Sequence, residues 1–431
     1  MLLTELPDPG EIPMLAAGLL RDDTGSVRRM PRGSYSLREL AADSDAVVVF
    51  DERIAGEIDD SIPALWEEIP SGETAFIALV PRMAAPQIDS CYCTPISSFL
   101  CSSEVFARFL DPGIDCVART LCFALLRAIA DGAVEVNRLL VRQIPFLHRP
   151  VYGRETVAKA LVLPHRGDPA FLRAALKYIG KSAGVPPAIR VGLDVGDNAE
   201  HGAFPDEYPG VEFFDFSPAP VGPYVIRQEL AERSPESLLA LQDSDDLSCY
   251  DRFAALGDAL AETGCGIVGS QELCLDEIRS LVQPVRYPLD CSASLALRAN
   301  HALLHATLMA HRGAFFKAGG LSTDLIIASD TQFLLRAFFN TTIRNVDEFL
   351  YIRRRHSRSL TNAPETVVDN PLRRRLGWEW TEHFDAIKRG ELKMESSTLR
   401  PMRRTDAWKV ERLWPARKRF DELLPGPEGR E

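Results

Sequence analysis

The sequence of 431 residues lacks the features that mark membrane and secreted proteins. No uncharged apolar run reaches the roughly 18 residues that a membrane-spanning helix needs. The start carries Glu5, Asp8 and Glu11 and no basic segment ahead of an apolar one, so we expect no signal peptide. The nine cysteines are scattered, odd in number and without a CxxC pair, which predicts reduced thiols in a cytoplasmic protein.

Positive charge is also scarce. The chain has 49 Lys and Arg against 61 Asp and Glu, a net charge of −12. A nucleic-acid-binding domain is normally basic, so we expect no nucleic-acid partner. The hydrophobic content of 46 % is that of a folded protein and excludes wholesale disorder. The length predicts two domains with an appended tail.

The tail differs from the rest of the chain in charge. Residues 351–431 hold 19 basic and 13 acidic residues, so this segment is +6 and the remainder is −18. It also contains four of the five tryptophans: Trp378, Trp380, Trp408 and Trp414. Two interpretations stay open, namely a helix pair packed on the main domain and a surface that rests peripherally on the inner face of an anionic membrane. The arginine run 373–375 is typical of a solvated helix face.

The middle of the chain, from about residue 157 to 361, alternates strand-like and helix-like patterns. Strands are predicted over 160–164, 189–193, 211–214 and 238–241, and helices over 169–179 and 225–234. Strands that alternate with helices predict a parallel, doubly wound sheet, with ligands bound at the carboxyl ends of the strands.

The strongest local feature is a group of acids directly after the strand 238–241. Asp243, Asp245 and Asp246 fall within four positions, with Ser244 between them. Carboxylates this close repel one another unless a cation or hydrogen-bond donors offset the repulsion. Their hard oxygen ligands suit Mg²⁺ or Mn²⁺, which can bridge a diphosphate. The alternative is a solvated acidic turn before the helix that follows at Tyr250.

Six motifs follow one another in a recognisable order. They are the strand and Pro-containing loop LVLPHRGDPAFLRAAL, the strand end VGLDVGDN, the helix start Gly222-Pro-Tyr-Val-Ile-Arg227, the acids 243–246, the Gly319-Gly320 pair followed by Ser329-Asp330, and the segment 353–361 with His356. In this order they make residues 160–361 similar to family 2 glycosyltransferases of the GT-A fold. The resemblance implies a GT-A-like α/β fold, a Rossmann-type mixed sheet flanked by helices.

The resemblance also implies a role for each motif residue. Nucleotide-sugar contacts are implied for Pro164, His165, Arg166, Asp194 (with Asp197 as second choice), Arg227, Asp243 and Ser244; an acceptor-side role for Gly319 and Gly320; and Mn²⁺ or Mg²⁺ ligation for Asp245, Asp246 and His356. Asp330 would be the general base that takes the proton of the acceptor hydroxyl. The implied reaction is an inverting, metal-dependent transfer from a nucleotide sugar, a UDP-sugar first, to a hydroxyl of a glycan or glycoconjugate.

The chain departs from the family pattern in two places. The acid pair expected before the acceptor helix is Ser329-Asp330, and the acids of the second strand are spread out as DVGD. Two rival functions stay open, a non-catalytic nucleotide-sugar-binding or scaffolding protein that keeps the fold and a nucleotidyltransferase. The second is disfavoured because residues 164–168 make a poor glycine-rich phosphate loop.

Two other patterns are set aside as sites. Gly264-Cys-Gly266-Ile-Val-Gly269 matches GxGxxG but precedes an apolar strand, whereas a dinucleotide site follows one. His301 and His305 are spaced four apart and lack the glutamate of a zinc protease. With His311 they offer a zinc set, and packed or acceptor-facing histidines are the favoured interpretation.

The first 155 residues hold no full catalytic set. A strand over 45–50, a helix pattern through Trp66 and a strand over 76–80 resemble the order of residues 238–268. One hypothesis is a degenerate repeat of the latter half of the transferase, with Arg53 in the place of Asp245 and Leu121 in that of Asp330. It would serve as a scaffold, an acceptor-holding module or a homodimer surface; the alternative is an unrelated α/β domain. We therefore divide the chain into 1–155, 156–361 and a helical basic tail, 362–431.

Overall fold

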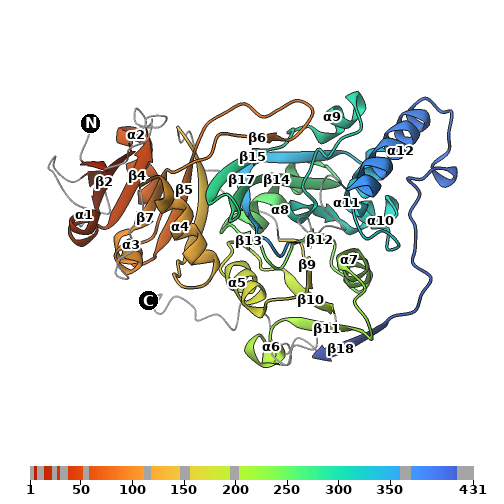
Figure 1. Cartoon of the computed structure of the whole chain (residues 1–431), viewed down its shortest axis with the longest axis horizontal. Helices are drawn as coiled ribbons and strands as arrows, with labels where there is room; N and C mark the ends of the chain where they lie inside the picture. The colour runs from red at the N-terminus through yellow and green to blue at the C-terminus, as the bar shows by residue number, and fades with distance from the viewer. Residues whose placement is uncertain are drawn as a thin grey trace.

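The computed structural model describes residues 4–6, 14–21, 27–29, 37–51, 58–110, 118–145, 156–194, 203–359 and 370–414. They form two β-sheets with helices packed on them, a seven-stranded sheet from the N-terminal region and an eleven-stranded sheet from the rest (Figure 1). The fold is thus mixed α/β, as the alternating patterns predicted. No helix within these ranges is long and apolar enough to cross a membrane.

The predicted parallel unit forms the first part of the larger sheet. Strands β9 (Lys159–His165), β10 (Ala188–Asp194), β11 (Glu212–Ser217) and β12 (Leu238–Leu241) are parallel in the order β11-β10-β9-β12. Helices α5 (Pro169–Gly180), α6 (Phe204–Glu207) and α7 (Pro223–Glu232) connect them. Asp168 caps α5 by accepting a 3.0 Å hydrogen bond from the Ala170 N–H, so the loop after β9 turns directly into the helix.

The rest of this sheet contains antiparallel pairs, so the sheet is mixed, as the resemblance implied; the alternation of strands and helices predicted its parallel part. Strand β16 (Met309–His311) runs antiparallel to both β12 and β14 (Ile267–Asp276), and β15 (Leu281–Arg286) is antiparallel to β14. The connection from β14 to β15 is too short for a parallel crossover, which needs a dozen or more residues. The long strand β17 (Ile343–Arg355) is parallel to β14 and antiparallel to the short β13 (Leu247–Ser248).

Four further helices cover this half of the sheet. They are α8 (Arg252–Thr263), α9 (Cys291–Leu297), α10 (Arg312–Lys317) and α11 (Ser329–Phe338). A single-turn 3₁₀ helix, His305–Thr307, precedes β16.

The tail contributes one helix and one strand to the described chain rather than a helix pair. Helix α12 (Pro371–Lys388) buries Trp380 and Phe384 in the core around α11, and the Phe384 ring lies 5.2 Å from that of Phe338. Strand β18 (Lys409–Trp414) then adds antiparallel to β11 at the sheet edge. Strand β18 of the tail is therefore part of the larger sheet, and α12 packs on its core.

The N-terminal sheet is built from β1 (Thr4–Leu6), β2 (Met14–Arg21), β3 (Val27–Arg29), β4 (Ala46–Asp51), β5 (Ala75–Pro81), β7 (Phe99–Ser102) and β8 (Arg138–Ile144). Its helices are α1 (Leu37–Asp43), α2 (Ile58–Glu67), α3 (Ser103–Leu110) and α4 (Ala118–Ala130). Strand β6 (Cys91–Tyr92) lies between β5 and β7 in the chain, but it belongs to the larger sheet, where it pairs with β15.

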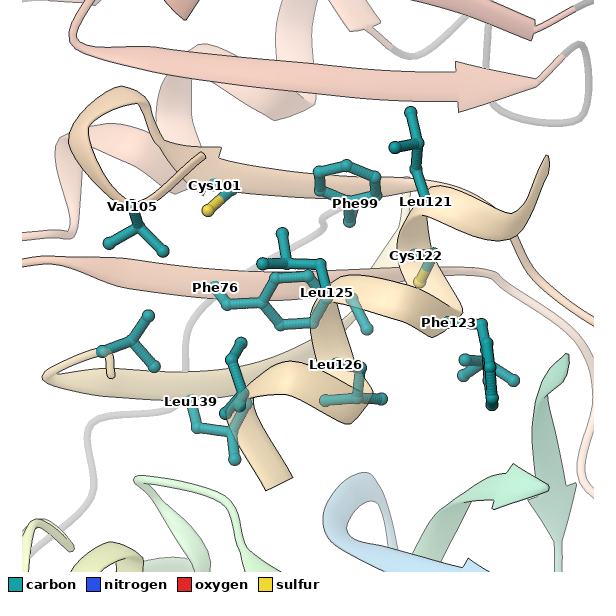
Figure 2. Packing of buried hydrophobic residues seen from close by; sticks show 14 of the residues in the cluster. Phe76, Phe99, Cys101, Val105, Leu121, Cys122, Phe123, Leu125, Leu126 and Leu139 are labelled. Carbon is teal, nitrogen blue, oxygen red and sulfur yellow. The ribbon is translucent and has the colours of Figure 1, made fainter. Parts of the chain in front are cut away.

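Helix α4 lies between the two sheets. Figure 2 shows its Leu125 beside Phe76 and its Leu121 beside Phe99, two phenylalanines of the N-terminal strands in the same buried cluster. The same buried cluster includes residues of the larger sheet: Leu273 and Leu275 of β14, Val282 of β15, and Phe349 and Ile352 of β17. The two sheets therefore share this hydrophobic cluster, and each also has buried clusters of its own.

Part of the N-terminal sheet has the same topology as part of the larger one. The strand order β4-β7-β5-β8 has antiparallel, antiparallel and parallel pairs, and so has β12-β16-β14-β17. Helix α3 begins at Ser103 directly after β7, and α10 begins 209 positions later, at Arg312, directly after β16. The outer neighbours differ, because β2 is antiparallel to β4 whereas β9 is parallel to β12.

Candidate active site

The acidic segment lies just beyond the carboxyl end of β12, in the centre of the larger sheet. Its backbone is held by Gln242, whose amide donates to the Asp246 carbonyl at 3.1 Å and whose Oε1 accepts from Arg252 at 2.6 Å. Arg252 also donates to the carbonyls of Leu241 and Ala306. This fully buried guanidinium therefore fixes the turn that carries the acids.

Asp246 points inward. Its side chain is buried, and its Oδ1 accepts a 2.7 Å hydrogen bond from the Arg354 N–H near the end of β17. Burial raises its pKa well above the usual range, and the nearby charges of Asp245 and Asp243 raise it further. A cation at this place would relieve that repulsion.

Asp245 faces the segment that follows β17. The imidazole Nε2 of His356 lies 3.0 Å from the Asp245 Oδ2, and the His356 ring packs 4.8 Å from that of Phe171 on α5. The structure thus brings together two residues more than a hundred positions apart that the resemblance assigned to one metal site.

Asp243, the first acid, faces α7. It forms an ion pair with Arg227 of α7, whose side chain is fully buried. Its backbone N–H donates to the Tyr351 hydroxyl at 3.2 Å, and its Oδ2 lies 3.8 Å from the His305 Nε2. Asp243 and Arg227, both predicted to contact the nucleotide sugar, are therefore in contact with each other.

Asp330 lies in the first turn of α11, where the helix N-terminus favours a negative charge. The Tyr224 hydroxyl donates to its Oδ1 at 3.0 Å, and the His305 Nδ1 lies 3.1 Å from its Oδ2. Burial alone would raise the pKa of Asp330, but His305, His301 and the Tyr224 hydroxyl outweigh burial and lower it far below its ordinary value. Asp330 is therefore ionised at neutral pH.

His305 and Tyr224 are site residues that the sequence did not predict as such. His305 stands between the predicted base and the acidic segment, with one ring nitrogen toward Asp330 and the other toward Asp243. His301 contacts the Thr331 hydroxyl at 3.1 Å, and burial lowers its pKa. The histidine pair HALLH was the available signal, and the preference for packed or acceptor-facing histidines over zinc ligands agrees with these contacts.

The predicted nucleotide-side residues lie at the ends of β9 and β10. Pro164 and His165 end β9, with His165 buried and its Nδ1 2.9 Å from the Ser244 hydroxyl, and Arg166 is exposed in the next loop. Asp194 ends β10 and accepts from the N–H groups of Val221 at 2.7 Å and Gly222 at 3.1 Å. Burial outweighs these bonds and raises its pKa. Asp197 falls outside the described residues.

The Gly319-Gly320 pair has positive φ angles of 85° and 62°. A Cβ on Gly320 would lie 2.4 Å from the Gln228 Oε1, which accepts a hydrogen bond from the Leu321 N–H. A Cβ on Gly319 would meet Pro401 at 2.2 Å. The pair is thus required by packing against α7 and the tail, whatever it contributes toward an acceptor.

The described residues contain no preformed group of three His, Cys, Asp or Glu side chains around one metal position. Asp245 and His356 are in contact, and Asp246 offers a buried carboxylate with a raised pKa. Such a donor set fits a hard divalent ion of the Mg²⁺ type, which is usually held by one or two carboxylates and completed by substrate phosphates and water. The zinc set His301, His305 and His311 is not assembled here.

No protein-family model matches the chain. No curated protein matches it either. Among solved structures it is similar to the S. aureus TarS fragment 1–349 in complex with UDP-GlcNAc, at 12 % identity and a TM-score of 0.42, over 53 % of this chain and 73 % of that one. The same fragment in complex with UDP gives 11 %, 0.40, 55 % and 73 %. A likeness this distant assigns no function to this chain.

Proposed function

We propose that the protein is a glycosyltransferase that moves a sugar from a nucleoside diphosphate, UDP first, to a hydroxyl group of a glycan or glycoconjugate. The observation that carries the proposal is the convergence of Asp330 and Asp243 on His305, beside the carboxyl ends of β9 and β12. Ligands of α/β sheets bind at this edge. A scaffold would have no need for an ionised carboxylate held by a histidine and a tyrosine at this edge.

In the proposed reaction Asp330 is the general base. Because it is already ionised, it can accept the proton of the acceptor hydroxyl as that oxygen attacks the anomeric carbon, with inversion. Tyr224 and His305 both stabilise the ionised form, so proton transfer must accompany bond formation, when the attacking hydroxyl becomes strongly acidic.

The leaving diphosphate needs positive charge on the opposite side of the sugar. Arg227 supplies a fixed guanidinium beside Asp243. A Mn²⁺ or Mg²⁺ ion held by Asp245, Asp246 and His356 would neutralise the diphosphate as it departs. His165, through Ser244, and Asp194, through the start of α7, would keep the walls of the nucleotide pocket in place.

Calorimetric titration with UDP tests the donor site. We expect binding by the wild type that strengthens with Mn²⁺, and loss of that strengthening in Asp245→Ala. Asp206→Ala is the matched control, because Asp206 is an exposed acid on α6. Metal-dependent binding that survives Asp245→Ala would remove Asp245 from the metal site, and no binding of any nucleoside diphosphate would favour the scaffold function.

We also infer a single reaction centre per chain. The shared strand order of the two sheets supports the hypothesis that the N-terminal region is a degenerate repeat of the transferase half. Leu121 lies 209 positions before Asp330 and is 1 % exposed within the hydrophobic core, so the repeat offers no base there. Arg53, the counterpart of Asp245, falls outside the described residues. We expect one nucleotide per chain in the titration; two would contradict this inference.

The basic tail supports a further proposal, peripheral contact with an anionic membrane. Arg374, Arg375 and Trp378 are exposed on α12, Trp378 by 67 %. Sedimentation with anionic but not zwitterionic vesicles, reduced in Arg374→Glu, would support it.

The homodimer also stays a prediction, tested by a light-scattering mass of twice the 47.8 kDa chain.

A further inference from the structure

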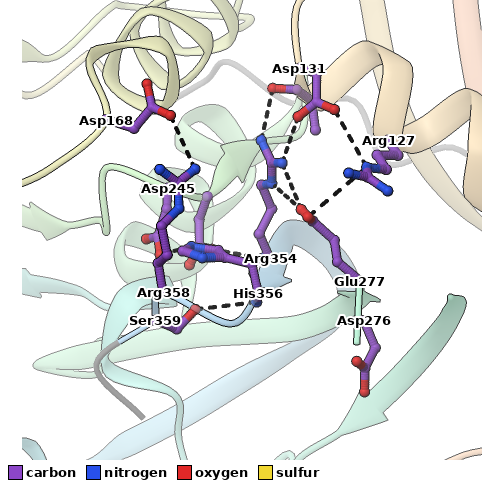
Figure 3. Close-up of polar contacts among 12 residues, drawn as sticks. Arg127, Asp131, Asp168, Asp245, Asp276, Glu277, Arg354, His356, Arg358 and Ser359 are labelled. Atoms are coloured by element: carbon purple, nitrogen blue, oxygen red, sulfur yellow. Dashed lines mark hydrogen bonds and ion pairs between the residues drawn. The ribbon is translucent and has the colours of Figure 1, made fainter. Parts of the chain in front are cut away.

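The far end of the proposed metal site is connected to the N-terminal region by one buried arginine. Arg354 is the last residue but one of β17, and its side chain turns away from the site toward the end of α4 (Figure 3). Its guanidinium donates to the Ala130 carbonyl at 3.0 Å, to Asp131 Oδ1 at 2.6 Å and to Glu277 Oε1 at 2.8 Å. Every nitrogen of this buried cation therefore has a partner.

The contact with α4 is directional as well as ionic. Ala130 is the last residue of α4, so Arg354 places its charge on the carbonyl end of the helix, where a cation is stabilised. Asp131 and Glu277 also attract Arg127, at 3.5 and 4.0 Å. The two acids and two arginines form a closed network between the sheets around the buried Arg354 guanidinium, while Arg127 and Asp131 are 49 % and 42 % exposed.

The backbone of the same residue reaches the site. The Arg354 N–H donates to Asp246 at 2.7 Å, and two positions further on His356 lies 3.0 Å from Asp245. The strand ends between these two residues, at Arg355, so the sheet ladder no longer holds His356. The Phe171 ring packs against both, with its centroid 4.6 Å from the Arg354 Cζ and 4.8 Å from that of the His356 ring.

We propose that the N-terminal region positions the active site through this connection, with Asp131 and the end of α4 holding Arg354 so that Asp246 and His356 stand in the arrangement that a metal–diphosphate requires. Asp131 and Arg354 are positioning residues, since their side chains contact each other rather than the side chains of the proposed metal ligands. This inference rests on the proposed function for its consequence in binding, while the positional coupling itself is independent of any ligand.

The variant Asp131→Ala tests the coupling, because Asp131 is 42 % exposed and its loss leaves the core intact. The control is Glu135→Ala, which removes the ion pairs to Lys177 and Lys181 that also join the N-terminal region to α5. Both variants delete one acid from the same end of the region, and only Asp131 contacts Arg354. Arg354→Lys is the conservative companion, keeping the charge and the backbone N–H and losing the forked contact.

Two measurements are made on each variant. The first is the imidazole signal of His356 in a proton–nitrogen spectrum of the full chain, assigned by its loss in His356→Gln; the chain has eight histidines. The second is the affinity for UDP with and without Mn²⁺. We expect Asp131→Ala to move the His356 signal and to weaken Mn²⁺-dependent UDP binding about three- to tenfold, with metal-free binding unchanged. Arg354→Lys should fall between the wild type and Asp131→Ala.

The outcomes separate the two claims. A His356 signal that stays in place in Asp131→Ala would overturn the inference, and so would equal effects in Glu135→Ala, which would indicate general loosening between the sheets. If the wild type binds no nucleoside diphosphate, the proposed function fails, and the His356 signal still decides whether Asp131 positions this segment.

Discussion

Replacing Asp330 by Asn separates the chemistry of the proposed site from its architecture. The amide has the shape of the carboxylate and can still accept from the Tyr224 hydroxyl at 3.0 Å, but it loses the charge that faces His305 at 3.1 Å. General base catalysis contributes about 10² to 10⁴ in rate. We therefore expect turnover to fall by that factor, about 3–5 kcal/mol in the activation barrier, while UDP affinity stays within about twofold.

The assay is the release of UDP from a panel of UDP-sugars, with water or an added oligosaccharide as the acceptor. Asp324→Asn is the matched control, because Asp324 is an exposed acid on the loop that leads to α11. Denaturant unfolding accompanies the assay, with an expected loss of about 1–3 kcal/mol for the broken charge contact. A rate for Asp330→Asn within threefold of the wild type, in a folded protein that binds UDP, would refute the assignment of the base.

Three further results follow from the described contacts. In His305→Ala, only the weaker contacts of His301 and Tyr224 still oppose the effect of burial, so the pKa of Asp330 should rise. Because a general base works only above its pKa, the acidic limb of the pH–rate profile should move to higher pH. An unmoved limb would show that His305 does not set the pKa of Asp330. Trp380→Ala should lower the free energy of unfolding by about 3–5 kcal/mol because Trp380 is 1 % exposed, and Trp378→Ala, at a position 67 % exposed, should change it by less than about 0.5 kcal/mol. Gly320→Ala should lower the free energy of unfolding by more than about 2 kcal/mol, because the strain of a positive φ and the clash of the new Cβ with Gln228 both act there. Gly390→Ala has a positive φ and open space around it, so it should lower the free energy of unfolding by about 1 kcal/mol. Equal losses in the two variants would contradict the packing argument.

The parallel half of the larger sheet could be predicted because its signals are local. Runs such as ALVLP and LLAL are short and fully apolar, and the helix over 169–179 repeats its apolar residues at helical spacing. Strand β12 has the predicted bounds, 238–241, and β9, β10 and β11 differ from the predicted ranges by one to three residues at their ends. The cap at Asp168 and the proline that follows it mark the start of α5 from sequence alone.

The antiparallel part could not be predicted in the same way, because its pairing is non-local. Strand β16 has three residues and lies between β12 and β14. Its register with these two strands depends on the path of the preceding chain through α9 and residues 298–308. Nor does the sequence signal that β18 returns from the tail to pair with β11, some 200 positions earlier. Such partners are selected by the edges that the rest of the fold leaves open.

In the proposed site, too, the local features could be predicted from the sequence and the long-range contacts could not. Asp243, Asp245 and Asp246 are adjacent in sequence, so their grouping is visible without a structure. His305 was missed as a partner of Asp330 because a spacing of four suggests one helix face, whereas His301 lies outside any helix and His305 begins a single 3₁₀ turn. Its place between Asp330 and Asp243 is set by three segments that meet only in the folded chain.

Thermal unfolding with UDP, GDP, dTDP and CMP, each with and without Mn²⁺, tests the central claim most directly. A ligand that binds only the folded protein stabilises it by about 2.7 kcal/mol at a hundred times its Kd. The proposed function predicts a rise in midpoint with one of these nucleotides, UDP first, and a larger rise when Mn²⁺ is present. An unchanged midpoint with all four nucleotides, with and without the metal, would contradict a nucleotide-sugar transferase.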